Sequence, residues 1–194
     1  MNIGIYIYDE AEVLDFSGPF EVFSTASRIY QGSNPFSVFL ISEQGGQVTA
    51  RAGYKVMADY AIDQHPELDV LIVSGGVHGA QMHKAEVVEW IAQQAESVNI
   101  VASVCTGAFL LARANVVVDQ DVTTHWEDIA DLQKRFPSLN VLRDVRWVDD
   151  GKVVTSGGIS AGIDMSLHLV SKLHSFDLAE ATAVQMEFNW TRNH

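Results

Sequence analysis

Short runs of apolar residues alternate with segments of helical period along this chain. The runs expected to form strands are residues 3–8, 36–42, 68–74 and 99–104. The segments expected to form helices are about 16–30, 86–95, 106–114, 127–135, 160–173 and 178–188. Strands that are apolar on both faces are typical of a parallel sheet covered by helices on its two sides. The alternation therefore predicts an α/β fold with a mostly parallel sheet.

Two further segments are expected to add β structure, the first of them at the sheet edge. Gln44-Gly-Gly-Gln47 is typical of a turn, and the polar-apolar alternation of 48–57 predicts a small β excursion. Residues 141–155 predict a hairpin around Asp149-Asp150-Gly151. Pro19 is expected in the first turn of the helix at 16–30, where proline is tolerated. No repeat or linker interrupts the chain, so we expect one domain over 1–194.

Charge and cysteine content narrow the possible partners. The formal net charge is −13 and only 12 lysines and arginines are spread along the chain, which argues against nucleic acid as a partner. A single cysteine cannot form an intramolecular disulfide, which fits a reducing compartment. The chain opens on a strand-like run without a basic segment before it, and no apolar stretch reaches membrane-spanning length. We therefore expect a cytoplasmic protein that does not bind membranes.

Cys105, the only cysteine, lies where a buried strand should pass into a helix. The run Ile100-Val-Ala-Ser-Val-Cys-Thr-Gly-Ala108 is typical of a nucleophile elbow. Backbone N–H groups and the positive end of a helix dipole at such a position favour the thiolate and can stabilise an oxyanion on a substrate. The alternative is an inert core residue, because free cysteine is among the most buried residue types.

Two other strand ends are expected to meet Cys105, since ligands of open α/β sheets bind beyond the carboxyl ends of the strands. Asp15 follows the first strand, and it can act either as an acid beside the thiol or as the N-cap of the next helix. Gly75 and Gly76 follow the strand at 68–74, and they predict either a tight turn or a close approach to a ligand through their N–H groups. No phosphate-binding glycine motif is present.

His125 and the segment 156–164 are the remaining candidates. His125 follows a short β-like run and precedes a helix, so it can lie near the thiol. Ser156-Gly-Gly-Ile-Ser-Ala-Gly-Ile-Asp164 predicts a helix entry, and Gly158 and Ile159 are the expected contact points if it borders the site. The histidines show no metal-binding spacing and there is one cysteine, so no metal or other cofactor is expected.

Taken in order, these segments resemble the DJ-1/PfpI superfamily, which is related to the class I glutamine amidotransferases. The resemblance rests on the following segments: Ile3-Gly-Ile-Tyr-Ile-Tyr8, Leu14-Asp-Phe-Ser-Gly-Pro-Phe-Glu-Val-Phe23, Leu71-Ile-Val-Ser-Gly-Gly76, Ser103-Val-Cys-Thr-Gly-Ala108, Thr123-Thr-His-Trp126 and Thr155-Ser-Gly-Gly-Ile-Ser-Ala-Gly-Ile-Asp164. Within the superfamily the chain is most similar to the isocyanide (isonitrile) hydratase branch and to the sensor domains of AraC-type regulators.

The resemblance implies a flavodoxin-like three-layer sandwich, a homodimer and a small-molecule substrate. It implies that Cys105 attacks the substrate, that Asp15 supplies a proton and that Thr106 assists through its N–H or hydroxyl group. Gly76 and Val77 are expected to line the opposite wall, with His125 supporting the pocket.

The chain departs from some members of the superfamily at one position, and the resemblance leaves more than one function open. Protease-like members carry histidine directly after the cysteine, and Thr106 in its place argues against proteolysis. The implied activity is hydration of isocyanides to N-substituted formamides. The alternative is a redox or small-molecule sensor, or a ligand-binding module, without the DNA-binding domain of the regulators.

Overall fold

The computed structural model describes residues 1–192, and an eight-stranded sheet forms its centre. The order of the strands in that sheet is β3 (Gln44–Thr49), β4 (Lys55–Ala61), β2 (Ser37–Ser42), β1 (Asn2–Tyr6), β5 (Val70–Val73), β6 (Ile100–Val104), β10 (Val153–Ser156) and β9 (Trp147–Asp150). The pairs from β4 to β10 are parallel, whereas β3 and β9 pair antiparallel at the two edges. The predicted α/β fold with a mostly parallel sheet is confirmed.

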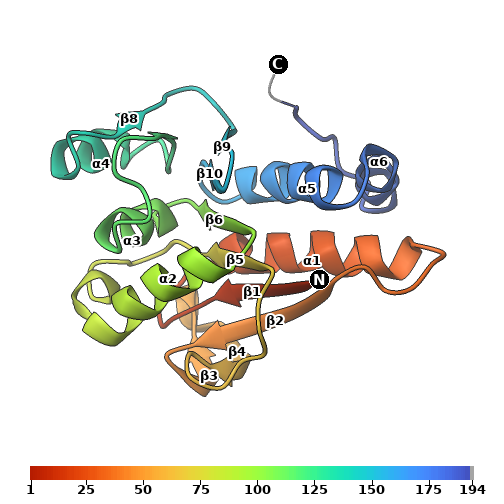
Figure 1. Ribbon diagram of the computed structural model, residues 1–194, viewed down its shortest axis with the longest axis horizontal. Coiled ribbons are helices and arrows are strands. Elements are labelled where there is room, and N and C mark those ends of the chain that lie inside the picture. Colours follow the sequence, from red (N-terminus) through yellow and green to blue (C-terminus); the bar gives the residue numbers. More distant parts are fainter. Residues whose placement is uncertain (193–194) are drawn as a thin grey trace.

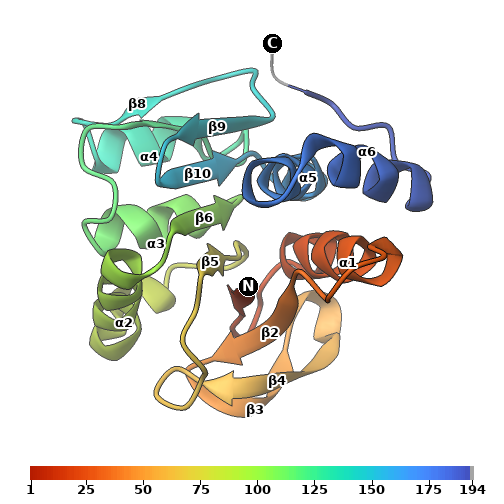
Figure 2. The same cartoon turned by 45° about the vertical axis from the view of Figure 1, so that its right-hand side comes forward.

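Helices cover both faces of the sheet and give three layers (Figures 1 and 2). One face carries α1 (Val13–Ile29), α5 (Ala161–Leu173) and α6 (Phe176–Gln185), and the other carries α2 (Ala85–Ser97) and α3 (Gly107–Arg113). The core lies between these layers, where the apolar side chains of β1, β5 and β6 are almost completely buried. Burial on both faces explains why these strands lack polar alternation.

Smaller elements complete the described chain. They are the 3-10 turns Arg51–Gly53 and Gln81–His83, the helix α4 (Ile129–Arg135), and a two-stranded parallel sheet of β7 (Asp121–Val122) and β8 (Asn140–Val141). Across residues 1–192, no helix combines the length and apolar character needed to cross a membrane.

Two local expectations from the sequence are wrong, and a third is confirmed with a later start. The turn predicted at Gln44–Gln47 is part of β3, where Gly45 and Gly46 have positive φ beside a bulge, and the chain reverses at Arg51–Gly53 instead. Bulges use glycine at positive φ much as turns do, so the two share a signature. Helix α1 begins at Val13, which moves Pro19 into its second turn. The hairpin predicted around Asp149-Asp150-Gly151 is present as β9 and β10, but its first strand begins at Trp147. Residues 142–146 form a connection instead, because β8 pairs with β7.

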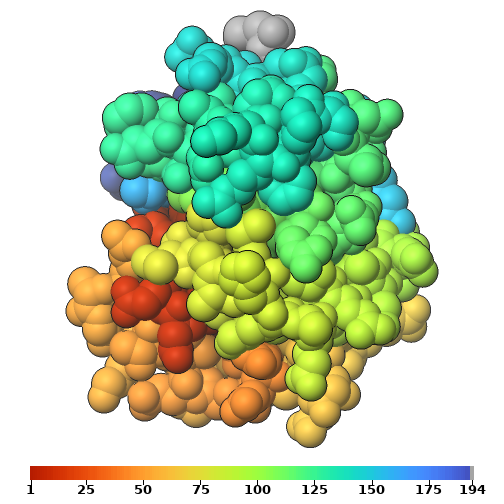
Figure 3. Space-filling model, turned by 90° about the vertical axis from the view of Figure 1, so that its left-hand side faces the viewer, coloured from red at the N-terminus to blue at the C-terminus, as the bar shows by residue number. Residues whose placement is uncertain are grey.

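The carboxyl ends of the central parallel strands meet on one side of the molecule. Figure 3 views this side, where the chain around residue 10, the segment after β5 and the segment from about 125 to 145 come together at the surface. The loops after β1, β5 and β6 therefore converge as the parallel arrangement predicts.

Gly107 places α3 directly against the end of β5, and this contact yields a stability prediction. A Cβ at Gly107 would lie 2.2 Å from the backbone oxygen of Val73, whereas a Cβ at the exposed Gly79 would meet no atom within 4 Å. We expect Gly107→Ala to lower the free energy of unfolding by about 2–3 kcal/mol, because the clash with backbone outweighs the better helix propensity of alanine. Gly79→Ala is the matched control, with a change within about 0.5 kcal/mol. Urea unfolding of both variants tests this, and equal midpoints would contradict it.

Candidate active site

Cys105 sits between β6 and α3 with a left-handed backbone conformation, φ 56°. This conformation costs a non-glycine residue about 1–2 kcal/mol, so the surroundings must hold it. The Cys105 N–H donates to the backbone oxygens of Ser156 (3.2 Å) and Gly157 (3.3 Å), and the Thr124 hydroxyl donates to the Cys105 carbonyl (2.8 Å). The predicted nucleophile elbow is confirmed, with a side chain that is buried but not sealed, at 7% exposure.

Thr106 connects the elbow to the loop after β5. Its hydroxyl oxygen accepts a hydrogen bond from the Gly76 N–H (2.9 Å) and its hydroxyl donates to the Gly76 carbonyl (3.0 Å). The Val77 N–H donates to the Glu10 carbonyl (3.1 Å). The amides of Gly76 and Val77 are thus already bonded. The binding of a ligand by the Gly76 N–H stays a prediction that requires its bond to open, and the position of Val77 at the wall stays a prediction too.

Gly75, just after β5, packs directly against Cys105 and Thr106. A Cβ at Gly75 would lie 2.6 Å from the Thr106 nitrogen and 2.7 Å from both Asp15 Oδ2 and Cys105 Cβ. Only glycine leaves room for these groups to meet. The Gly75-Gly76 pair at a strand end was the signal in the sequence, but the sequence did not separate the packing role of Gly75 from the hydrogen-bonding role of Gly76.

Asp15 is fully buried in the first turn of α1 and its carboxyl group lies beside the thiol. Oδ1 accepts a hydrogen bond from the Ile159 N–H (3.1 Å). Within residues 1–192, no donor meets the buried Oδ2 with good hydrogen-bond geometry. The helix is capped at Glu12, so the alternative of Asp15 as the N-cap is wrong. Ile159 presents its N–H at φ 57°, an unusual conformation for a β-branched residue.

Burial controls the protonation of both groups. Desolvation raises the pKa of Asp15 to about 7, although hydrogen bonds from the Ile159 N–H and the Cys105 thiol act in the opposite direction. Desolvation also raises the pKa of Cys105 well above its usual range, and the negative charge of Asp15 adds to this, against a smaller effect of the Thr106 N–H. The sequence-based expectation of a thiolate at this elbow is therefore wrong for the resting protein. Burial and the neighbouring carboxylate raise the pKa of the thiol more than the N-terminus of α3, a helix of 7 residues, can lower it.

A cavity of about 600 Å³ opens beside the elbow. It is lined by residues 123–126, 129, 143–146 and 157–161. Gly158 joins it to the thiol, since a Cβ there would lie 2.1 Å from His125 Cδ2 and 3.3 Å from Cys105 Sγ. His125, Gly158 and Ile159 thus gather at one wall as the sequence predicts, while Gly76 and Val77 are not among the lining residues.

The His125 ring has Cδ2 next to Gly158, and its Nδ1, on the other edge of the ring, lies near two carboxylates. Its Nδ1 lies 3.6 Å from Asp128 Oδ2 and 3.8 Å from Glu127 Oε2, and 19% of its side chain is exposed. These contacts are consistent with a supporting role of His125 in the cavity wall. A role of His125 in binding stays a prediction. Arg143 and Arg146 also line the cavity, and sequence reasoning missed them because no local pattern marked the 142–146 connection as part of the site. Trp126, a further lining residue, belongs to the motif around His125 but was not assigned a role.

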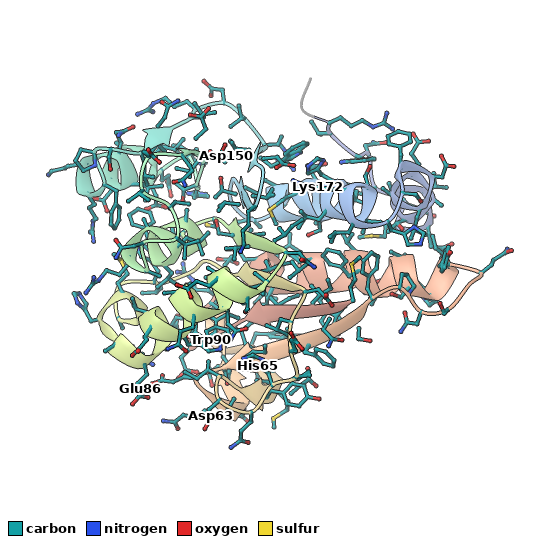
Figure 4. The ribbon with its side chains drawn as sticks, in the orientation of Figure 1. Asp63, His65, Glu86, Trp90, Asp150 and Lys172 are labelled. Atoms are coloured by element: carbon teal, nitrogen blue, oxygen red, sulfur yellow. The ribbon has the colours of Figure 1, made fainter. Side chains whose placement is uncertain are left out.

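A second hollow of about 640 Å³ lies away from the thiol, between α2 and the end of β4. Asp63, Glu86 and Trp90 line it, and Figure 4 shows them grouped with His65 on that side of the molecule. It contains acidic and amide side chains but no nucleophile. In the part of the chain that the structure describes, no three His, Cys, Asp or Glu residues form a group able to hold a metal ion.

Comparison with known proteins places these motifs in a family. The sequence profile of the DJ-1/PfpI family matches residues 1–172. The chain belongs to the DJ-1/PfpI family. It is 31% identical over 191 residues to an isonitrile hydratase of Pseudomonas putida, across 97% of this chain and 78% of that enzyme.

Two other comparisons add to this. The chain is 29% identical over 192 residues to the HTH-type transcriptional regulator GbdR of Pseudomonas aeruginosa, and this covers 99% of the chain but only 52% of the regulator. A crystal structure of a ThiJ/PfpI family protein from Pseudomonas syringae superimposes with a TM-score of 0.86 at 24% identity, over 100% of this chain and 77% of that one. The family and fold are thus shown, whereas the chain spans about half the length of the regulator that it matches.

The buried carboxyl group predicts an unusual pH dependence of stability. Because the pKa of Asp15 is raised to about 7 in the folded protein, the folded state retains a proton that the unfolded state loses above its ordinary pKa of 3.8. Stability should therefore fall as pH rises from about 4 to 7. We expect Asp15→Asn to remove this loss and to raise the free energy of unfolding above pH 7, by an amount on the order of 2–4 kcal/mol. Urea unfolding across this pH range measures the effect, and parallel curves for the two proteins would contradict it.

Proposed function

We propose that this protein is a cysteine-dependent hydratase that converts isocyanides to N-substituted formamides. The observation that carries the proposal is the buried pair formed by the Cys105 thiol and the Asp15 carboxyl group, held against each other at a nucleophile elbow. The similarity to an isonitrile hydratase along 97% of the chain supports the same reaction class.

The pair is suited to a substrate that needs a nucleophile and a proton at one carbon. In the first step the Asp15 carboxylate takes the thiol proton as Sγ attacks the terminal isocyanide carbon. Asp15 then delivers that proton to the same carbon, which gives a thioimidate, S–CH=N–R, with no change in the total number of protons. A carboxyl group whose pKa lies near 7 can both accept and donate the proton at neutral pH.

Water completes the cycle. A water molecule adds to the thioimidate carbon, the C–S bond breaks, the nitrogen is protonated and the thiol is restored, so the net change is the addition of one water to the isocyanide. The cavity beside Gly158 supplies a route for that water to the sulfur-bound carbon.

Thr106 and the neighbouring wall residues have supporting roles in this proposal. The Thr106 N–H interacts with the sulfur and partly offsets the charge that develops there. Its hydroxyl holds Gly76, which fixes the loop carrying Gly76 and Val77 against the elbow. His125 shapes the cavity from the opposite side, next to Gly158.

The proposal predicts turnover of simple alkyl isocyanides with a defined pH profile. The reactive pair must carry one proton, so kcat/KM should rise as pH passes through about 7, where Asp15 loses its proton, and then level off.

Cys105→Ala should abolish formation of the formamide, and Asp15→Asn should lower kcat by about 10²-fold or more. Glu21→Gln removes a carboxylate from an exposed position on the same helix and serves as the matched control. Formamide production is measured by chromatography, and full activity of Cys105→Ala would overturn the mechanism.

A ligand-sensing module is the second candidate, favoured by the similarity to GbdR over 99% of the chain. The raised pKa of the buried Cys105 thiol argues against the redox form of this alternative, because oxidation sensors depend on an accessible thiolate. A ligand sensor instead predicts saturable binding without turnover. It also predicts binding that Cys105→Ala leaves intact, which separates it from the hydratase.

A further inference from the structure

Two arginines line the cavity beside Cys105 in a chain that has few cations. The formal net charge of the protein is −13 with 12 lysines and arginines in total, yet Arg143 and Arg146 both border this one cavity. Arg143 is exposed, and 37% of the Arg146 side chain is exposed. Local positive charge in a strongly acidic protein selects for anions at that position.

Arg146 is held in a fixed orientation. Its Nε donates to Asp164 Oδ2 at 2.8 Å and its second terminal nitrogen donates to the same oxygen. Asp164 is fully buried, and its other oxygen accepts a hydrogen bond from the Thr191 N–H at 2.7 Å. The Ser160 hydroxyl lies 3.3 Å from both terminal nitrogens of Arg146. Asp164 on α5 and Ser160 at its N-cap thus fix the guanidinium group, and the N–H of the first terminal nitrogen that Ser160 does not engage is left as a donor for the cavity.

The connection 142–146, which carries these arginines, runs into β9, and β9 is anchored on α5. Asp149 pairs with His168 Nε2 (2.6 Å) and Lys172 Nζ (2.8 Å) on α5, and His168 stacks on Trp147 with ring centroids 3.9 Å apart. Figure 4 shows Lys172 on α5 close to the strand that carries Asp150. A cation on an anchored segment can bind a ligand without a large cost of ordering.

The same backbone joins Arg146 to the nucleophile. The Gly157 N–H donates to the Arg146 carbonyl (2.9 Å), and the Gly157 carbonyl accepts from the Cys105 N–H (3.3 Å). We infer that the cavity is a subsite for a carboxylate on the substrate, with Arg146 and Arg143 binding that carboxylate while the isocyano carbon reaches Cys105. This inference rests on the proposed function and narrows its substrate class to isocyanides that bear a carboxylate.

The charges that line the cavity favour a singly charged group. Asp144 also borders it, and Asp164 already offsets part of the charge of Arg146. A monoanion suits this balance better than a phosphate dianion, which would meet the Asp144 carboxylate. Asp144 has φ 58°, a conformation that asparagine tolerates well, so Asp144→Asn changes charge with little change in backbone.

The catalytic test compares isocyanoacetate with ethyl isocyanoacetate, which share the isocyano group and differ in the carboxylate. We expect wild-type kcat/KM to favour the anion, Arg146→Gln to reduce this preference at least tenfold, and Arg143→Gln to reduce it by a smaller factor. Asp144→Asn should increase the preference. Arg28→Gln removes the same charge near the end of α1 remote from Asp15, and it should leave the preference unchanged. An unchanged preference in both cavity arginine variants overturns the inference.

The binding test does not depend on turnover. N-formylglycine, the product expected from isocyanoacetate, is titrated calorimetrically into the full chain beside its ethyl ester. Binding of the anion that weakens at least tenfold in Arg146→Gln supports the subsite even if no isocyanide is hydrated, in which case the proposed function alone fails. Turnover of both isocyanides without discrimination supports the hydratase but overturns the subsite. Equal binding of acid and ester also overturns the subsite. Arg146→Gln leaves the buried Asp164 without its positively charged partner. The double variant Arg146→Gln/Asp164→Asn, and Arg143→Gln at an exposed position, therefore keep the test valid if the single variant unfolds.

Discussion

The left-handed backbone of Cys105 is the constraint on which the rest of the site depends. The Cys105 N–H donates to the carbonyls of Ser156 and Gly157 at the end of β10, and the Thr124 hydroxyl donates to the Cys105 carbonyl. Thr106, the next residue, fixes the loop after β5 through both polar groups of the Gly76 backbone. Three segments that are distant in sequence are therefore joined at Cys105 and Thr106, and the hydrogen bonds to Cys105 offset its backbone strain.

The electrostatics of the site differ from those of enzymes that store a thiolate. Burial raises the pKa of both Asp15 and Cys105, and the negative charge of Asp15 raises the pKa of Cys105 further. The thiol therefore keeps its proton near neutral pH, while the carboxyl group titrates at about pH 7. A pair of this kind costs folding stability near neutral pH. The same feature makes a proton available at the sulfur when an uncharged electrophile arrives, which accounts for both the predicted instability and the proposed chemistry.

The sequence predicted the parts of the site that follow from topology. Cys105, Asp15 and the Gly75-Gly76 pair each follow a strand, and parallel strands bring such positions together. It did not predict Arg146, whose orientation depends on a buried carboxylate on α5, or the protonation of the thiol, which depends on burial by the whole fold. The Ile159 N–H that binds Asp15 comes from 144 residues away, and no local pattern carries that information.

The central claim is that the Cys105–Asp15 pair gives up its first proton from the carboxyl group and keeps the second on sulfur. Infrared spectroscopy across a pH titration tests this directly, with the carboxylic acid C=O band assigned by Asp15→Asn and the S–H band by Cys105→Ala. We expect the C=O band to disappear as pH rises through about 7 while the S–H band persists. Loss of the S–H band with retention of the carboxylic acid band, or a carboxyl group that titrates near 4, would contradict it.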